Sequence, residues 1–290
     1  MSKKRFSNVD YSYSLLPTSR KAAFKDVYKH NFMTIFKCGT MLFLSLLPIL
    51  IFSVFMEIGK MGMTLEFYSE EDLFGVLLLW DISLNLGLLI LFTIVVLFLS
   101  GIFRVLKLLV FQEGIDFFYD FRMGIKENFK HFFLIYLIFA GFYALTYLLR
   151  AFFFGSFIGP VALLICLVMF LPALLWSYLH INIYQTKMWD YIKASYFFYF
   201  KNIGWSLLGL LMVVWPIIVI FLFYENLIFN NIDFIFILVK DVLLIALSLF
   251  YYPMVIVIFM LFSNSKFDLY INQDNYPEIY RKGLYQPKEK

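Results

Sequence analysis

Between Ile82 and Phe103 the chain reads ISLNLGLLILFTIVVLFLSGIF, a stretch that contains no Asp, Glu, Lys or Arg. A helix needs about 20 mostly apolar residues to cross the hydrocarbon of a bilayer, and this stretch is long enough to do so. Backbone groups cannot bond to water inside lipid, so they must be paired along the segment itself, as they are in an α-helix. The stretch therefore predicts a transmembrane helix.

Five other stretches have the same character: Cys38–Phe55, Phe132–Leu149, Phe157–Leu179, Trp205–Phe223 and Val242–Phe262. Hydrophobic residues make up 62% of the sequence and charged residues 15%, whereas soluble domains are about half apolar and about a quarter charged. A soluble domain of this length could not bury so much apolar surface. We therefore expect an all-α integral membrane protein with six transmembrane helices, forming a single membrane domain over residues 1–290 that includes a cytoplasmic tail at 264–290.

Basic residues gather in alternate connections between these stretches. The second connection carries Arg104, Lys107, Arg122, Lys126 and Lys130, and the N-terminal segment, the fourth connection and the tail are basic as well. The first, third and fifth connections are poor in Lys and Arg, and the first (residues 57–81) is an acidic loop. Because Lys and Arg remain on the cytoplasmic side of a membrane, we expect a multi-pass protein of the cell (plasma) membrane with both termini in the cytoplasm.

A short amphipathic segment that ends in Asn precedes the first, third and fifth spans. The three segments are Ser19–Asn31, Asp116–Asn128 and Asp190–Asn202. Ser or Asp at the start can cap a helix N-terminus, and Asn tolerates the left-handed conformation that ends a helix. We expect three elbow helices in the headgroup plane, each turning at its Asn (Asn31, Asn128 or Asn202) into a transmembrane hairpin, so that three degenerate repeats cover residues 19–110, 116–183 and 190–263.

The sequence shows few groups that could perform chemistry. The central part of every predicted span lacks Asp, Glu, Lys and Arg, and its polar groups are small ones such as Asn85, Thr93, Ser100 and Thr146. Such groups usually bridge helices. Neither the two cysteines nor the three histidines have the spacing of a metal site. We expect no cofactor, no metal, no enzymatic activity and no nucleic-acid partner, and we expect the lipid bilayer and anionic headgroups near the elbows as contacts.

The most distinctive stretch is FRVLKLLVFQEGIDFFYDFRMGIKENFKHF, Phe103–Phe132. It resembles the YesL-like family of bacterial polytopic membrane proteins, a domain of unknown function. The family pattern of a Glu followed by Asp-Phe-x-x-Gly-x-Lys-x-Asn falls here on Glu113, Asp120, Phe121, Gly124, Lys126 and Asn128. We expect a structural role for this motif. The resemblance implies an accessory role in carbohydrate uptake, with ABC-transporter subunits as partners.

Three classes of function remain open. A non-catalytic accessory or regulatory protein would account for the lack of chemical groups and for the basic, aromatic elbows. A passive permease for a neutral small solute would use the breaks at Pro and Gly together with Asn85 and Thr93. An enzyme acting on lipid would need a polar cluster at the interface, for which Asp116, Asp120 and His131 are the candidates, although helix capping also explains the two aspartates.

Overall fold

The chain forms a bundle of long helices, and the computed structural model describes residues 16–65, 70–153, 157–184, 186–228 and 234–285. The main helices are α1 (Arg20–Leu65), α2 (Glu70–Val110), α3 (Phe117–Phe152), α4 (Ile158–Ile183), α5 (Met188–Lys201), α6 (Ile203–Ile228), α7 (Phe234–Ala246) and α8 (Tyr252–Phe267). A π-helical turn, η2 (Leu247–Tyr251), joins α7 to α8. A second one, η3 (Asp268–Asn272), leads from α8 into α9 (Gln273–Asn275).

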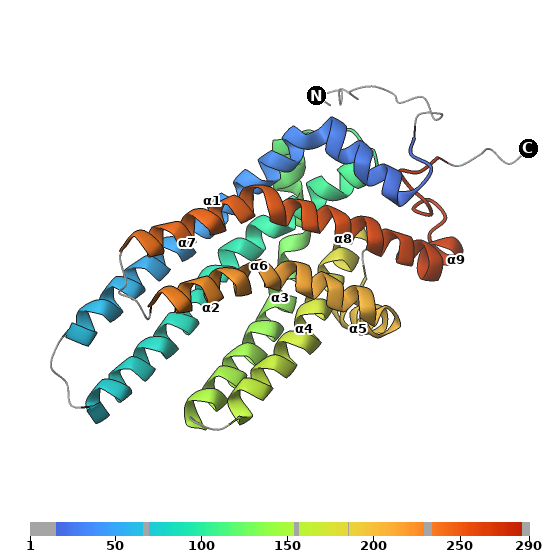
Figure 1. Cartoon of the computed structure of the whole chain (residues 1–290). Coiled ribbons are helices and arrows are strands. Elements are labelled where there is room, and N and C mark those ends of the chain that lie inside the picture. The colour runs from blue at the N-terminus through green and yellow to red at the C-terminus, as the bar shows by residue number, and fades with distance from the viewer. Residues whose placement is uncertain (1–15, 66–69, 154–156, 185, 229–233, 286–290) are drawn as a thin grey trace, which may run out of the picture.

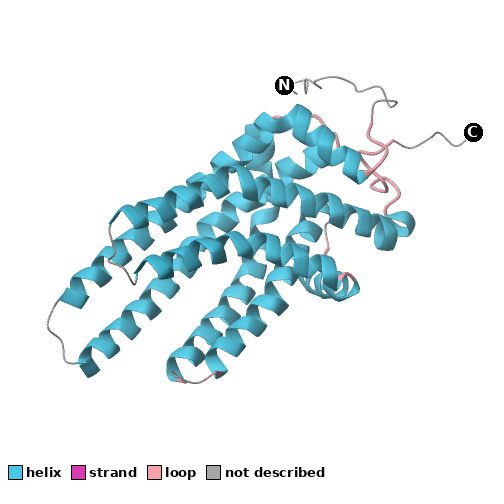
Figure 2. Ribbon diagram, in the orientation of Figure 1, coloured by secondary structure: helices cyan, strands magenta, loops and turns pink. Residues whose placement is uncertain are grey.

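The long helices pack side by side and spread apart from one end of the molecule. α2 packs along both α1 and α3, α3 packs along α4, and α8 lies against α1 and α2. The first described residues, α5 and α9 lie near one end, and the α1–α2 and α3–α4 hairpins diverge toward the other (Figure 1). The loops among the described residues join helices or lie at the two ends of the chain (Figure 2). We call the end that holds the start of α1, the α2–α3 connection, α5 and the residues after α8 the elbow end.

Within the described residues, five helical stretches are long and apolar enough to cross a membrane, and there are six if the bent pair of α5 and α6 is counted as one span. The five are Arg20–Gly59, Leu78–Val110, Phe117–Leu149, Ile158–Ile183 and Val239–Asn275, and the angle between α5 and α6 is 101°. The all-helical architecture expected from the sequence is therefore confirmed, and the length and composition of these helices are compatible with a multi-pass membrane protein. The described parts of the first and last chain segments lie at the same end (Figure 1).

Two boundaries expected from the sequence are wrong. The acidic connection 57–81 is largely helical, because α1 continues to Leu65 and α2 begins at Glu70; residues 66–69 lie outside the described part. The last span does not end at Phe262, because the chain stays helical to Asn275. Residues 264–285 are packed on the bundle, and 1–15 and 286–290 lie outside the described residues.

The elbow predictions are met in two of the three segments. α1 bends at Asn31, whose φ and ψ of −122° and 22° are not helical, and α5 ends at Asn202. α3, in contrast, runs helically through Asn128, so the turn expected there is wrong. The Asn128 side chain is instead bonded to Asn182 of α4, which holds this part of α3 against its neighbour. With one of its three turns missing, the threefold repeat stays a prediction.

The predicted N-terminal caps show the same partial agreement. The Ser19 hydroxyl accepts a hydrogen bond from the Ala22 amide, and the Asp116 carboxylate accepts one from the Tyr119 amide. Asp190 is not a cap, because α5 begins two residues earlier, at Met188. Its charge lies in the first turn of α5, where it still favours the positive end of the helix dipole.

The closest contact between the first and last spans is made by backbone alone. A Cβ atom at Gly39 would lie 2.0 Å from the carbonyl oxygen of Leu249, so only glycine fits at this point of α1. Leu249 belongs to η2 and stands four residues before Pro253, which has no N–H to give to that carbonyl. The π-helical turn and the glycine together let the two backbones touch.

We predict that Gly39→Ala lowers the stability of the folded protein in detergent by about 1–3 kcal/mol, because a backbone clash cannot be relieved by a rotamer change. Gly141→Ala is the matched control, since no atom lies within 4 Å of a Cβ placed there. The control should be neutral or slightly stabilising, as Ala is the better helix former. Thermal unfolding of both variants gives the measurement, and equal midpoints would contradict the packing described here.

Candidate functional site

The family-like motif lies at the junction of α2 and α3, and most of its residues hold that junction together. The Asp120 carboxylate accepts a hydrogen bond from the Asp116 amide at 2.9 Å, so the two aspartates cap the start of α3. Phe121 packs against the rings of Phe98 and Phe117. Lys126 is exposed and points to no partner in this junction. The contacts of Asp120 and Phe121 are therefore capping and packing contacts of the α2–α3 junction.

Gly124 of this motif is the point of closest approach between α2 and α3. A Cβ there would lie 2.7 Å from the Arg104 Cβ and 2.9 Å from the Gly101 Cα. Arg104 and Glu127 form an ion pair beside this contact. Small residues at such crossings allow membrane helices to pack closely. Gly124 therefore allows α3 to pack closely against α2.

Asn182, near the end of α4, is a hydrogen-bonding centre that the sequence did not reveal. Its side-chain amide donates to the Phe103 carbonyl at 2.7 Å, and its Oδ1 accepts from Asn128 at 3.2 Å. Its own carbonyl accepts from the Lys107 ammonium at 2.7 Å. Asn182 thus joins α2, α3 and α4 at the elbow end. The sequence signal that could have indicated this role was an Asn just beyond the end of the predicted span Phe157–Leu179.

The residues after α8 fold back on the elbow end and join three parts of the chain. Arg20, at the start of α1, forms an ion pair with Asp268 at 2.6 Å and donates to the Lys282 carbonyl at 3.0 Å. The Lys282 ammonium pairs with Glu113 of the family-like motif at 2.5 Å. We call residues 276–285, together with their contacts to Arg20 and Glu113, the C-terminal clasp.

Two further features fix the clasp. Gly283 has a φ of +77°, and a Cβ there would lie 2.6 Å from the Val110 carbonyl oxygen. Leu284 is buried, and the Tyr285 amide donates to the Pro17 carbonyl at 3.0 Å. Behind the clasp, the Tyr184 hydroxyl donates to Asn272 Oδ1. Burial raises the pKa of Tyr184, so its hydroxyl remains a donor.

The amphipathic helix α5 presents a second surface at the elbow end. Tyr191, Ser195 and Phe198 are buried against the bundle. The opposite side exposes Trp189, Phe197 and Phe200 together with Lys193 and Lys201. The Lys193 ammonium lies 5.9 Å from the centre of the Trp189 ring, and that of Lys201 lies 5.6 Å from the ring of Tyr270. Rings beside lysines are typical of helices that lie at the lipid headgroups.

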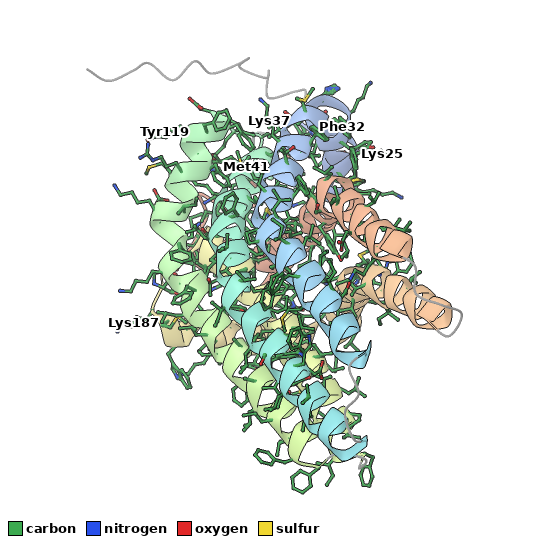
Figure 3. The ribbon with its side chains drawn as sticks, turned by 90° about the vertical axis from the view of Figure 1, so that its left-hand side faces the viewer. Lys25, Phe32, Lys37, Met41, Tyr119 and Lys187 are labelled. Carbon is green, nitrogen blue, oxygen red and sulfur yellow. The ribbon has the colours of Figure 1, made fainter. Side chains whose placement is uncertain are left out.

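The same combination continues across α1 and α3. Tyr119, Lys37, Phe32 and Lys25 follow one another across the top of the molecule in Figure 3, from α3 to α1. The Lys37 ammonium lies 5.8 Å from the centre of the Phe117 ring. Exposed Lys29, Lys126 and Lys130 extend this surface. We call the exposed rings and lysines of α1, α3 and α5 at the elbow end the basic aromatic face.

The bundle encloses an apolar cavity. This cavity of about 390 Å³ lies among α1, α2, α3, α4, α6, α7 and α8, and its accessible wall consists of apolar atoms. None of Asn85, Thr93, Ser100 and Thr146 belongs to this wall. Thr93, Ser100 and Thr146 donate to carbonyls of their own helices, and Asn85 bonds to the Asp81 carbonyl and the Tyr143 hydroxyl. The polar side chains predicted in the spans are therefore already paired.

Among the described residues, no group of three or more His, Cys, Asp and Glu side chains could hold a metal ion. Cys38 and Cys166 are buried, free thiols. His180 is enclosed by the rings of Tyr184, Tyr191 and Phe267, and His131 lies against Tyr191. Comparisons with protein-family models, curated proteins and solved structures found no match.

We predict that Arg20→Gln releases the clasp, because it removes a largely buried partner of Asp268 and is expected to cost about 1–3 kcal/mol after allowance for partial exposure. Limited proteolysis should then cut the residues after Asn275 faster than in the parent protein. The exposed neighbour Lys21 supplies the control, Lys21→Gln. Equal cleavage rates in the two variants would show that the ion pair does not hold the clasp.

Proposed function

We propose that this chain is a non-catalytic, multi-pass membrane protein that serves another membrane system as an accessory or regulatory partner. The observation that carries the proposal is the division of its polar groups. At the elbow end they hold helices together or form the exposed basic aromatic face, while the interior cavity has an apolar wall. Such a protein is suited to contact lipid and other proteins at that face.

The groups that an enzyme acting on lipid would need have structural contacts. Asp116 and Asp120 cap α3, and the His131 ring lies 5.5 Å from the ring of Tyr191. One oxygen of each of these two carboxylates accepts a hydrogen bond from a backbone amide at the start of α3. These contacts favour a structural role for all three residues.

The alternative, a passive permease for a neutral small solute, has weaker support. A sugar or amino acid crossing the bundle would have to exchange its water for protein partners. A polar group buried without a hydrogen bond costs about 2–7 kcal/mol, and the cavity wall offers no polar atom to replace the water. Asn85 and Thr93, the polar groups on which this alternative relied, are bonded elsewhere.

The choice of partner rests on the resemblance to the YesL-like family. That resemblance implies carbohydrate uptake as the process and ABC-transporter subunits as the partners. The basic aromatic face supplies a matching surface, since exposed lysines near the headgroups attract anionic lipid by about 1 kcal/mol each and exposed rings such as Trp189 favour protein contacts.

The orientation follows from the same face, because its lysines belong on the cytoplasmic side. We predict that a membrane-impermeant thiol reagent applied to intact cells labels Phe157→Cys and does not label Lys187→Cys, in a background in which Cys38 and Cys166 are replaced by Ala. Both positions are exposed, one at the α3–α4 turn and the other at the start of α5. Labelling with the opposite preference would reverse the orientation.

We predict that a photoreactive amino acid in place of Lys126 or Lys193 cross-links to a membrane subunit of a carbohydrate ABC transporter in native membranes, because both positions belong to the basic aromatic face. The same amino acid at Phe157 is the matched control at the opposite end. Mass spectrometry of the cross-linked products identifies the partner.

A flux measurement separates this proposal from transport. The purified protein in liposomes under a pH gradient should not accumulate sugars or amino acids, because the accessible wall of its interior cavity consists of apolar atoms. Accumulation that an uncoupler abolishes would contradict the accessory role, as would cross-links that form only at Phe157.

A further inference from the structure

The apolar cavity extends along the bundle. Its wall includes Leu171 to Leu179 of α4 and Gly209 to Ile217 of α6. Each of these ranges covers about 12 Å at 1.5 Å per helical residue. The cavity wall therefore extends over more than two helical turns along the spans.

The three tyrosines in its wall turn their hydroxyl groups away into backbone. Tyr136 donates to the Leu89 carbonyl at 2.5 Å, Tyr178 to the Phe132 carbonyl at 3.4 Å, and Tyr252 to the Val213 carbonyl at 3.4 Å. Each tyrosine contributes only its ring to the cavity. These tyrosines therefore add apolar surface to the cavity and no hydrogen-bonding group for a polar ligand.

The wall is more tightly buried toward the elbow end. Phe103, Tyr178 and Leu179 are at most 3% exposed there, and they close that end of the cavity. Farther along the spans the lining side chains are less buried, and Phe92 is 39% exposed. The cavity is accordingly closed toward the headgroups of the elbow end and less enclosed deeper in the membrane.

Water does not occupy such a space, because it would find no partner for its hydrogen bonds. An empty cavity would forfeit the dispersion contacts of its walls. The medium around the spans, in contrast, consists of flexible hydrocarbon chains that match an elongated apolar cavity in both chemistry and shape. A polar solute is excluded because it would lose its hydrogen bonds to water and find no polar atom in the wall to replace them.

We propose that this cavity is a lipid-binding site that holds one acyl chain of a membrane phospholipid, the chain entering between helices from the surrounding bilayer. The site is independent of the accessory function and of the basic aromatic face. It makes the bound lipid an integral part of the bundle, in contact with α1, α2, α3, α4, α6, α7 and α8 at once.

The test uses a phospholipid that carries a diazirine near the end of one acyl chain, incorporated into liposomes that contain the full-length protein. After irradiation, peptide mapping locates the cross-links. In the parent protein they should fall on residues of the cavity wall, such as Leu175, Val213 and Val255, in addition to outward-facing side chains. A free fatty acid with the same diazirine is tested separately.

Val213→Trp fills the cavity, and Leu211→Trp adds the same side chain to the outer surface of the same helix, where Leu211 is 58% exposed. We expect Val213→Trp to reduce cross-links to the remaining wall residues about tenfold, because the larger side chain displaces the acyl chain. Leu211→Trp should leave them unchanged. Leu175→Phe provides a second filling variant if Val213→Trp does not fold.

Three outcomes would overturn the proposal. The first is labelling of outward-facing residues alone in the parent protein. The second is wall labelling that persists at full strength in a folded filling variant. The third is wall labelling by the free fatty acid with none by the phospholipid, which would assign the cavity to a different ligand. Elution volume and thermal midpoint establish which variants are folded.

Discussion

The lack of water around the spans strongly favours a partner inside the protein for each polar group within them. Ser45, Thr93, Ser100 and Ser263 meet this requirement by donating to carbonyls three residues earlier in their own helices. The tyrosines of the cavity wall meet it by donating to the backbone of a neighbouring helix. Once these groups are paired, apolar surface remains for contacts between helices and with lipid.

At the elbow end, longer polar and charged side chains find their hydrogen-bonding partners inside the protein in the same way. Asn182 bonds to α2 and α3, and the Arg20–Asp268 pair joins the first helix to the last. These contacts combine charge with hydrogen bonds in a place that is only partly accessible to water, where paired charges are retained and unpaired ones are costly. The helices are thus fixed firmly to one another at the end from which they diverge (Figure 1).

Much of the architecture could be predicted from single segments, because hydropathy, capping residues and the bends at Asn31 and Asn202 are local properties. The straight course of α3 through Asn128 could not, because it depends on a partner in α4. The polar stretch after Phe262 has the sequence of a solvated tail. It stays helical because Arg20 forms an ion pair with its Asp268 and the Tyr184 hydroxyl donates a hydrogen bond to its Asn272. The bend of 101° between α5 and α6, the clasp and the cavity likewise arise only from packing between distant segments.

The contact between Gly39 and the Leu249 carbonyl also limits how the molecule can move. No side chain lies between the two backbones at this point, so α1 and the α7–α8 helix cannot slide past each other without a collision of main-chain atoms. The contact therefore fixes the point along their lengths at which the two spans cross, and with it the register of the first span against the last.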